Sequence, residues 1–274
     1  MTHADHLVKE DRRLSETVAV VFGGGRGIGR ATALKLAAAG AQVEVVARTA
    51  SEVEGVVSEI KAQGGLAAAH VADITRADDL RALADNLLSK YGRVDLLINS
   101  AGVSLIAPLE STAEADWDLV LDTNLKGPYL TVQAMLDLLR ASGCAQVINI
   151  ASKVGLTGHE QVTAYTAAKA GLIGFGRALA QELSPDNIRV TTLCPGPVDT
   201  PMRWAATPNM DRSQAISAES VAETILFLAT LDGGTSIGSE VVIEATGYDE
   251  GAVSLEKSPT ATSSVDRGRE PGRR

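Results

Sequence analysis

The fold is decided by residues 17–36, TVAVVFGGGRGIGRATALKL. Residues 17–22 are apolar and rich in Val, which predicts a buried strand, and residues 30–36 have the composition of a helix. Between them stand Gly23, Gly27 and Gly29 in the spacing G-x-x-x-G-x-G. Glycines permit positive φ and let the backbone approach a pyrophosphate, which the free amides and dipole of a helix N-terminus stabilise. The segment therefore predicts a strand, a nucleotide-binding turn and a helix, with a purely structural turn as the alternative.

Further apolar strands alternate with segments of helical periodicity. We expect them at residues 42–47, 66–70, 94–99, 147–152, 189–194 and 240–244. The runs at 94–98 and 146–150 are too continuously apolar for strands with one face in water, so helices are expected on both faces of the sheet. Because a crossover between parallel strands needs a helix, the alternation predicts a single-domain α/β fold with a doubly wound, seven-stranded, mostly parallel sheet.

The two ends of the chain differ from this pattern. Residues 1–15 are polar and charged, and residues 248–274 are rich in Ser, Thr, Gly, Pro and charge without periodicity. The first segment predicts an N-terminal extension and the second a disordered tail, with a partner-binding tail as the alternative. The nucleotide-binding domain is expected to span residues 16–247.

Composition excludes several classes of protein. The 274 residues carry 25 Lys and Arg against 34 Asp and Glu, and only 3% are aromatic, which argues against a nucleic-acid partner. No apolar run is long enough to span a bilayer, and residues 1–16 lack the apolar core of a secretory signal, so a cytoplasmic protein with no membrane partner is expected. Cys144, Cys194 and the four histidines match no metal-ligand spacing, and no metal is expected.

The second predicted strand ends beside an arginine. A site for NAD usually has Asp or Glu there, hydrogen-bonded to the ribose 2'-hydroxyl, whereas this chain has Arg48. A guanidinium pairs with a 2'-phosphate, and Arg26 in the glycine turn adds a second positive charge. The pair predicts NADP(H) in preference to NAD(H), and two solvated surface arginines are the alternative.

A tyrosine and a lysine share one helix face near the end of the fifth strand. Tyr165 and Lys169 are separated by four residues in a helical segment, and Ser152 stands at the carboxyl edge of the sheet, where doubly wound folds bind ligands. Taken singly, each residue has a structural alternative: a core tyrosine, a solvated lysine or a capping serine.

Jointly these motifs resemble the core, tyrosine-dependent type of the short-chain dehydrogenase/reductase family. The resemblance covers residues 17–247 and is carried by the glycine turn, Asp73, residues 99–102 (NSAG), Asn124, Ser152, Tyr165, Lys169 and residues 195–200 (PGPVDT). It implies a Rossmann fold and an NADP(H)-dependent oxidoreductase that transfers hydride between the nicotinamide and a carbonyl or secondary alcohol.

The resemblance also implies a role for each member of the catalytic set. Tyr165 would exchange a proton with the substrate oxygen, but a free tyrosine has a pKa of about 10 and is a poor base near neutrality. The ammonium group of Lys169, together with the cationic nicotinamide in the oxidised complex, would favour the phenolate and lower that pKa. Ser152 would hold the substrate oxygen, and Asn124 would hold a water in a proton relay to Lys169.

Other residues are expected to bind the cofactor and the substrate. The expected cofactor contacts are Gly23, Gly25, Arg26, Gly27, Ile28, Gly29, Arg48, Asp73, Ile74, Asn99, Ala101, Gly102, Tyr165, Lys169, Pro195, Gly196, Val198 and Thr200. Asp73 has an alternative as the cap of a helix that begins near Thr75. The expected substrate contacts are Ser152, Val154, His159, Tyr165, Met202 and Trp204, which form a mainly apolar, open pocket.

Several functions agree with such a site. Within the family, a 3-oxoacyl-thioester reductase is the leading hypothesis, followed by a broad ketone or aldehyde reductase and an NAD-dependent alcohol dehydrogenase. A nucleotide-sensing regulator without catalysis is the alternative from another class. The small residues at 171–176, together with the resemblance, favour a homotetramer or homodimer.

Overall fold

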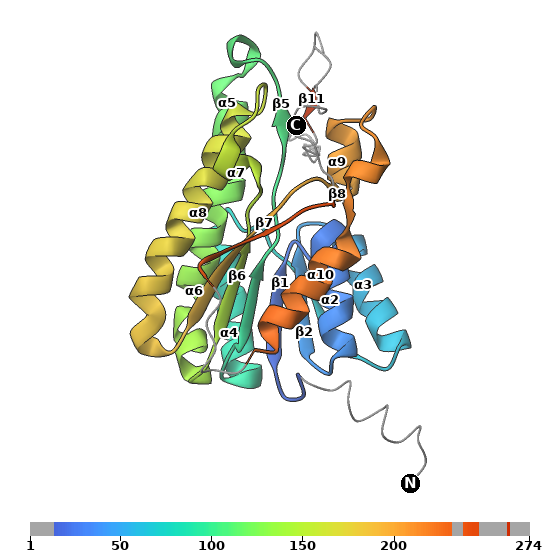
Figure 1. Cartoon of the computed structure of the whole chain (residues 1–274). Coiled ribbons are helices and arrows are strands. Elements are labelled where there is room, and N and C mark those ends of the chain that lie inside the picture. The colour runs from blue at the N-terminus through green and yellow to red at the C-terminus, as the bar shows by residue number, and fades with distance from the viewer. Residues whose placement is uncertain (1–13, 232–237, 247–261, 264–274) are drawn as a thin grey trace, which may run out of the picture.

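A seven-stranded parallel sheet forms the centre of the structure, a computed structural model that describes residues 14–231, 238–246 and 262–263 (Figure 1). The strand order is β10-β7-β6-β4-β1-β2-β3, and every pair in this sheet is parallel. The strands are β1 Val18–Phe22, β2 Gln42–Ala47, β3 Leu66–Val71, β4 Leu96–Asn99, β6 Gln146–Ile150, β7 Arg189–Pro195 and β10 Glu240–Ile243. The doubly wound α/β fold is therefore confirmed, and the sheet is wholly rather than mostly parallel.

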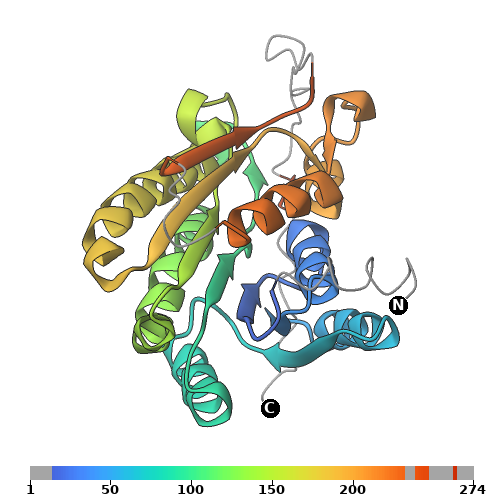
Figure 2. The same cartoon turned by 60° about the horizontal axis from the view of Figure 1, so that its bottom comes forward.

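Helices cover both faces of the sheet, as Figure 2 shows. One face carries α2 Gly27–Ala38, α3 Ala50–Ala62 and α10 Ala218–Ala229, and the other carries α4 Ala77–Tyr91, α6 Gly127–Ser142 and α8 Thr163–Leu183. Alternate residues of β1 supply the two cores: Ala19 and Val21 face the first layer, and Val20 and Phe22 the second. The continuous apolar runs thus reflect burial on both faces.

The strand order reverses at β1. The chain runs outward from β1 through β2 to β3, and then returns to β4 on the other side of β1. The carboxyl ends of β1 and β4 consequently flank a crevice, which is where open parallel sheets bind ligands.

Shorter elements gather beyond this edge, in the upper part of Figure 1. They are β5 Leu105–Ile106, α5 Glu114–Leu121, α7 Val154–Thr157, β8 Val198–Asp199, α9 Pro201–Ala206 and β9 Ile216–Ser217, with the single turns Leu109–Ser111, Asp122–Lys126 and Arg212–Gln214. A further turn, Ser184–Asp186, lies at the opposite edge, between the end of α8 and the start of β7. Strand β6 ends at Ile150, two residues before the predicted Ser152, so this serine lies in the loop that follows the strand.

The ends of the chain lie mostly outside the described residues. Within the predicted tail, Thr262–Ser263 form β11, which pairs antiparallel with β5. The remainder of the tail, the N-terminal extension and the domain boundary stay predictions. In the described part of the chain, no helix combines the length and apolarity needed to cross a membrane.

Candidate active site

The glycine turn joins β1 to α2 at the crevice. Gly23 has φ +77°, and a Cβ there would lie 2.5 Å from the backbone nitrogen of Ala101. A Cβ on Gly29 would lie 2.1 Å from the carbonyl oxygen of Gly23. Helix α2 begins at Gly27 with no side-chain cap and no acidic residue in its first turn. The backbone is therefore open to an anionic ligand at this helix N-terminus.

A cavity of about 380 Å³, here called the glycine-turn cavity, lies against this turn. Most of the predicted cofactor residues line it: Gly23, Gly25, Arg26, Gly27, Ile28, Arg48, Asp73, Ile74, Ala101, Gly102, Tyr165, Lys169 and Thr200. The cavity is also lined by residues that sequence reasoning did not select, including Thr49, Glu52 and Thr123. It thus extends from the end of β2 to the tyrosine on α8.

Five predicted cofactor residues do not line this cavity. Gly29 packs beneath the turn, and Pro195, Gly196 and Val198 line a neighbouring cavity instead. Asn99 is buried: its amide donates to Asn149 Oδ1 at 2.9 Å, and its Oδ1 accepts from the Thr131 hydroxyl at 2.7 Å. Asn99 therefore ties β4 to β6 and α6, as the predicted support of the central strand requires, while its amide is already occupied.

Two ion pairs stand at the outer end of the glycine-turn cavity. Arg26 Nη1 lies 4.0 Å from Glu52 Oε1, and Arg48 Nη1 lies 4.0 Å from Asp73 Oδ2. The two arginine side chains are about half exposed, at 51% and 47%. The geometry places both guanidinium groups around one opening, each within reach of a carboxylate. Pairs this long and this exposed are weak, so each guanidinium can be redirected to a ligand at small cost.

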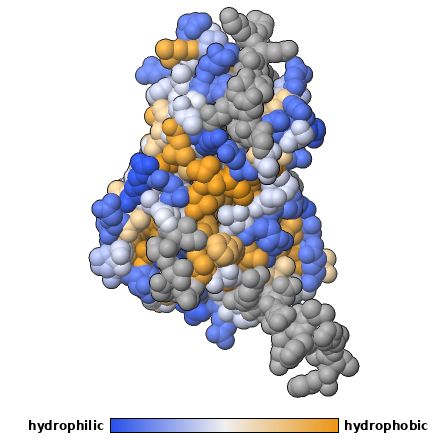
Figure 3. All heavy atoms as spheres, in the orientation of Figure 1, coloured by the Kyte–Doolittle hydropathy of each residue, from blue (hydrophilic) through white to orange (hydrophobic). Residues whose placement is uncertain are grey.

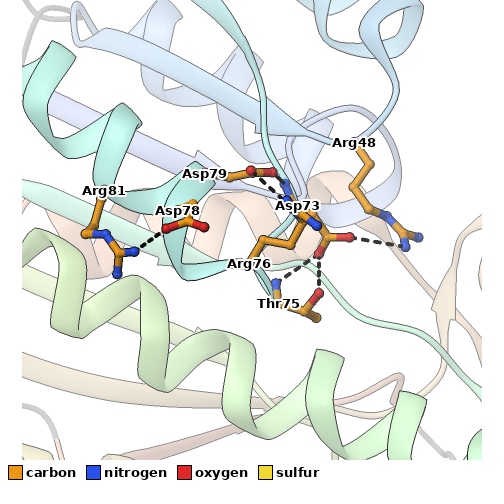
Figure 4. Close-up of polar contacts among 7 residues, drawn as sticks. All are labelled: Arg48, Asp73, Thr75, Arg76, Asp78, Asp79 and Arg81. Carbon is orange, nitrogen blue, oxygen red and sulfur yellow. Dashed lines mark hydrogen bonds and ion pairs between the residues drawn. The ribbon is translucent and has the colours of Figure 1, made fainter.

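Asp73 also orders the loop before α4, as Figure 4 shows. Its Oδ1 accepts hydrogen bonds from the backbone N–H of Thr75 at 2.9 Å and from the Thr75 hydroxyl at 2.8 Å. Its own backbone N–H donates to Asp79 Oδ2 at 3.0 Å. Since α4 begins only at Ala77, Asp73 acts as a turn residue ahead of the helix while its second oxygen faces Arg48.

Tyr165 and Lys169 line the inner end of the same cavity, and Ser152 lies next to Tyr165. Tyr165 and Lys169 lie on α8, and Lys169 Nζ is 5.6 Å from the centre of the Tyr165 ring. The buried Lys169 donates to the carbonyl oxygen of Ile150 at 2.8 Å, and the hydroxyl groups of Ser152 and Tyr165 are hydrogen-bonded. The structure thus brings together the three residues from two separate segments.

Asn124 reaches the same place from a π-helical turn between α5 and α6. Its amide donates to the carbonyl oxygens of Val103 at 2.9 Å and Val120 at 2.8 Å, while its buried Oδ1 has no hydrogen-bond partner among the described atoms. A Cβ on Gly102 would lie 2.7 Å from this Oδ1 and 3.8 Å from Lys169 Nζ. Asn124 Oδ1 and Lys169 Nζ therefore both lie beside Gly102.

Burial acts in opposite directions on the two titrating groups. It raises the pKa of Tyr165, and the hydrogen bond from Ser152 and the charge of Arg203 oppose this rise without cancelling it. Burial lowers the pKa of Lys169 to about 8. Desolvation has these effects because it disfavours the charged form of both groups. The lowering of the Tyr165 pKa that is expected from Lys169 and an oxidised nicotinamide together stays a prediction.

A second cavity of about 370 Å³, here called the outer pocket, adjoins the first. The two cavities share Ile28, Ala151, Tyr165, Thr200 and Met202, so Tyr165 stands at their junction. Five of the predicted substrate residues line the outer pocket: Ser152, Val154, His159, Tyr165 and Met202.

The sixth predicted substrate residue, Trp204, is placed elsewhere. It is absent from the pocket lining; its indole N–H donates to Asp199, and the Arg212 guanidinium lies 4.3 Å from its ring centre. The neighbouring Arg203 lines the pocket instead, which sequence reasoning missed. The helical spacing of α9 could have indicated Arg203: it is three residues from Ala206, which is four residues from the predicted Met202, and all three line the pocket.

In the part of the chain that the structure describes, no group of three or more His, Cys, Asp or Glu residues is placed to hold a metal ion.

Comparisons with known proteins agree with this geometry. Residues 17–211 match the family described as short chain dehydrogenase. A 3-oxoacyl-[acyl-carrier-protein] reductase from Synechocystis is 38% identical over 79% of this chain and 90% of that protein. A (2S)-[(R)-hydroxy(phenyl)methyl]succinyl-CoA dehydrogenase subunit from Thauera aromatica is 34% identical over 84% and 96%. The crystal structure of a metagenomic short-chain oxidoreductase in complex with NADP matches with a TM-score of 0.74 at 35% identity, covering 84% of this chain and 98% of that one.

Proposed function

Because the chain belongs to the short-chain dehydrogenase/reductase family, and is therefore an oxidoreductase that uses a nicotinamide cofactor, we propose that Tyr165 is its proton donor and acceptor. One observation carries the assignment. Tyr165 stands where the glycine-turn cavity meets the outer pocket, hydrogen-bonded to Ser152 and close to Lys169. A substrate oxygen at this junction would contact a hydroxyl pair from one cavity while the cofactor occupies the other.

The glycine-turn cavity fits NADP(H). A backbone cradle in which Gly23 and Gly29 leave no room for a Cβ suits a pyrophosphate, and Arg26 and Arg48 suit a 2'-phosphate. NADP(H), when bound, supplies or accepts the hydride. Support for NADP also comes from the structural relative solved in complex with it. We assign the remaining cavity residues, including Asp73, Ile74 and Thr200, to cofactor binding.

The proton chemistry belongs to the chain's own residues. During reduction Tyr165 gives its hydroxyl proton to the substrate oxygen, which Ser152 holds by a hydrogen bond. Lys169, with a pKa of about 8, is a source from which that proton is replaced near neutrality. Asn124 Oδ1 has no hydrogen-bond partner among the described atoms and lies beside Gly102, where Lys169 Nζ also lies. We therefore assign Asn124 to hold a water in the proton relay between Lys169 and solvent.

A 3-oxoacyl thioester is the leading substrate. Relatives from Synechocystis, Thermotoga maritima and Chlamydia trachomatis that are named 3-oxoacyl-[acyl-carrier-protein] reductases share 38%, 34% and 32% identity with this chain. The outer pocket, with Val154, Val162 and Met202 in its wall, has apolar surface for an acyl chain. A broad ketone or aldehyde reductase is the second candidate, because the relatives also include a protein named D-threitol dehydrogenase.

Turnover of a tyrosine variant tests the catalytic assignment. Tyr165→Phe is expected to lower NADPH-dependent reduction of an acetoacetyl thioester by about 10²- to 10⁴-fold, the usual contribution of a general acid, with NADPH affinity retained. Tyr129→Phe is the matched control, because Tyr129 lies on α6 with 44% of its surface exposed and lines neither cavity. Equal turnover by the two variants would overturn the assignment, and would favour a regulator that binds nucleotides without catalysis.

We also propose a homo-oligomer. Figure 3 shows hydrophobic residues gathered on the face that carries α10 and the edge strand β10, and Phe227 and Val242 of these elements are 55% and 49% exposed. Two glycines of the stretch 171–176 already pack within the chain, Gly171 against Leu125 and Gly176 against Thr192. Exposed Phe227 and Val242 therefore support a subunit interface better than these glycines do. Phe227→Glu is expected to give a smaller particle in light scattering; an unchanged mass would contradict this interface. The cytoplasmic location stays a prediction.

A further inference from the structure

The outer end of the glycine-turn cavity holds a carboxylate that sequence reasoning did not select. Glu52 lines the cavity from the first turn of α3, four residues after Arg48. Among the described residues, the charged side chains that line this end are Arg26, Arg48, Glu52 and Asp73. Two guanidinium groups therefore face two carboxylates, and the end that suits a 2'-phosphate is not simply cationic.

The two carboxylates are held differently. Asp73 is engaged within the chain, because its Oδ1 accepts two hydrogen bonds from Thr75 and its Oδ2 faces Arg48. Glu52 Oε1 lies 4.0 Å from Arg26 Nη1, and within the described part of the chain neither oxygen of Glu52 accepts a hydrogen bond. The Glu52 side chain is 34% exposed. Glu52 is therefore the carboxylate that keeps its acceptor capacity for a ligand.

The glycine turn makes room for Glu52. A Cβ on Gly25 would lie 2.8 Å from Glu52 Cβ and 2.9 Å from Glu52 Oε2. Gly25 is not among the glycines with positive φ, so the close approach of Glu52, rather than the backbone conformation, requires glycine at this position. Gly25 lines the cavity as well. The packing thus holds the Glu52 carboxylate against the turn that receives the cofactor.

Glu52 and the two arginines favour different forms of the cofactor. A ribose 2'-hydroxyl donates a hydrogen bond to a carboxylate, which is how sites for NAD usually bind this group. A 2'-phosphate carries about −1.5 to −2 charge at neutral pH, so a carboxylate repels it. Guanidinium groups act in the opposite sense, because they pair with the phosphate.

We propose, on the basis of the cofactor site assigned above, that this chain binds NAD(H) as well as NADP(H) and that Glu52 determines the balance between them. The Glu52 carboxylate accepts a hydrogen bond from the 2'-hydroxyl of NAD(H). With NADP(H), Arg26 exchanges Glu52 for the 2'-phosphate, and the carboxylate that remains nearby limits the preference for this cofactor. Glu52 is thus a specificity-determining residue and not a catalytic one.

Binding of NADPH and NADH, followed by cofactor fluorescence without a carbonyl substrate, tests the proposal. The wild type is expected to bind both, and NADPH more tightly. Glu52→Gln releases Arg26 from an exposed ion pair, so NADPH is expected to bind about 2- to 5-fold more tightly. The variant also replaces a charged acceptor with a neutral one, so NADH is expected to bind about 2- to 10-fold more weakly. The readout is the ratio of the two dissociation constants, which a general loss of folded protein leaves unchanged.

Glu54→Gln is the matched control. Glu54 is an exposed residue of the same helix and does not line the cavity, so the ratio is expected to stay at the wild-type value. The role of Glu52 would be overturned by an unchanged ratio in Glu52→Gln, by an equal change in Glu54→Gln, or by a wild type that binds NADPH and not NADH. A wild type that binds neither cofactor would instead overturn the cofactor site on which the proposal rests.

Discussion

Arg48 provides a sharp test of how this chain selects its cofactor. The guanidinium lies at the end of β2, 4.0 Å from Asp73 and at the outer end of the glycine-turn cavity. Arg48→Gln keeps a polar side chain there and removes the charge. If Arg48 binds the 2'-phosphate, the variant is expected to lose efficiency with NADPH and to retain it with NADH, which lacks this phosphate.

The size of the effect follows from two opposing interactions. A hydrogen bond between charged groups contributes about 1.5–3 kcal/mol. Against this, Arg48 must leave Asp73, and an ion pair with 47% and 28% exposed side chains contributes about 0.2–1 kcal/mol. The difference is about 0.5–2.8 kcal/mol, which corresponds to a loss of about 2- to 100-fold in kcat/KM for NADPH.

The assay measures kcat/KM for NADPH and NADH at saturating carbonyl substrate in the wild type and in two variants. Arg76→Gln is the matched control: Arg76 lies near Asp73 in Figure 4, pairs with Asp79 and does not line the cavity, so no change is expected. A parallel loss with both cofactors in Arg48→Gln, or an equal loss in Arg76→Gln, would refute the reasoning.

Three further changes test other parts of the structure. Since burial lowers the pKa of Lys169 to about 8, its protonated form is lost above that pH, and kcat/KM for reduction should fall above about pH 8. Arginine stays protonated in this range, so Lys169→Arg should move the fall to higher pH. An unchanged pH profile in the variant would contradict the proton relay through Lys169. Gly29→Ala would place a Cβ 2.1 Å from a carbonyl oxygen of the turn and is expected to lower the free energy of unfolding in urea by about 1–3 kcal/mol. Gly174 has open space around it, so Gly174→Ala is expected to raise the free energy of unfolding. Equal effects of the two substitutions would contradict the close packing at Gly29. Glu44→Gln is expected to cost about 1–3 kcal/mol at pH 7, and this difference should shrink as the pH falls below 4.5, because the carboxylate is lost in the wild type too; a constant difference would contradict the ionised state.

Glu44 shows how the fold builds a charged cluster away from the active site. This buried carboxylate on β2 accepts hydrogen bonds from Tyr91 at 2.6 Å and Gln42 at 2.8 Å, and it contacts His70 Nε2 at 2.5 Å. Burial alone would raise its pKa, but these bonds and the charge of Lys90 leave it below the ordinary value. The cluster ties β2 to the edge strand β3 and to α4. Sequence reasoning did not identify it, because its members come from three elements.

Local patterns were enough for the fold and for much of the candidate site. Strand positions could be predicted because burial on both faces leaves continuous apolar runs, and the turn could be predicted because close packing at Gly23 and Gly29 excludes any side chain. Tyr165 and Lys169 share a face through helical geometry alone. Their placement near Ser152 follows once a parallel sheet gathers its carboxyl ends at one edge.

The sequence by itself therefore determined the strands of the sheet, the glycine turn and the pairing of Tyr165 with Lys169, since each depends on residues close together in the chain. Only the tertiary structure decided that Arg203 lines the outer pocket while Trp204 turns toward Arg212, and that Asn99 is used up within the core. It also decided that burial raises the pKa of Tyr165. The physical reason is that side-chain direction on a short helix, hydrogen-bond partners and desolvation all depend on segments distant in sequence that fold against the residue.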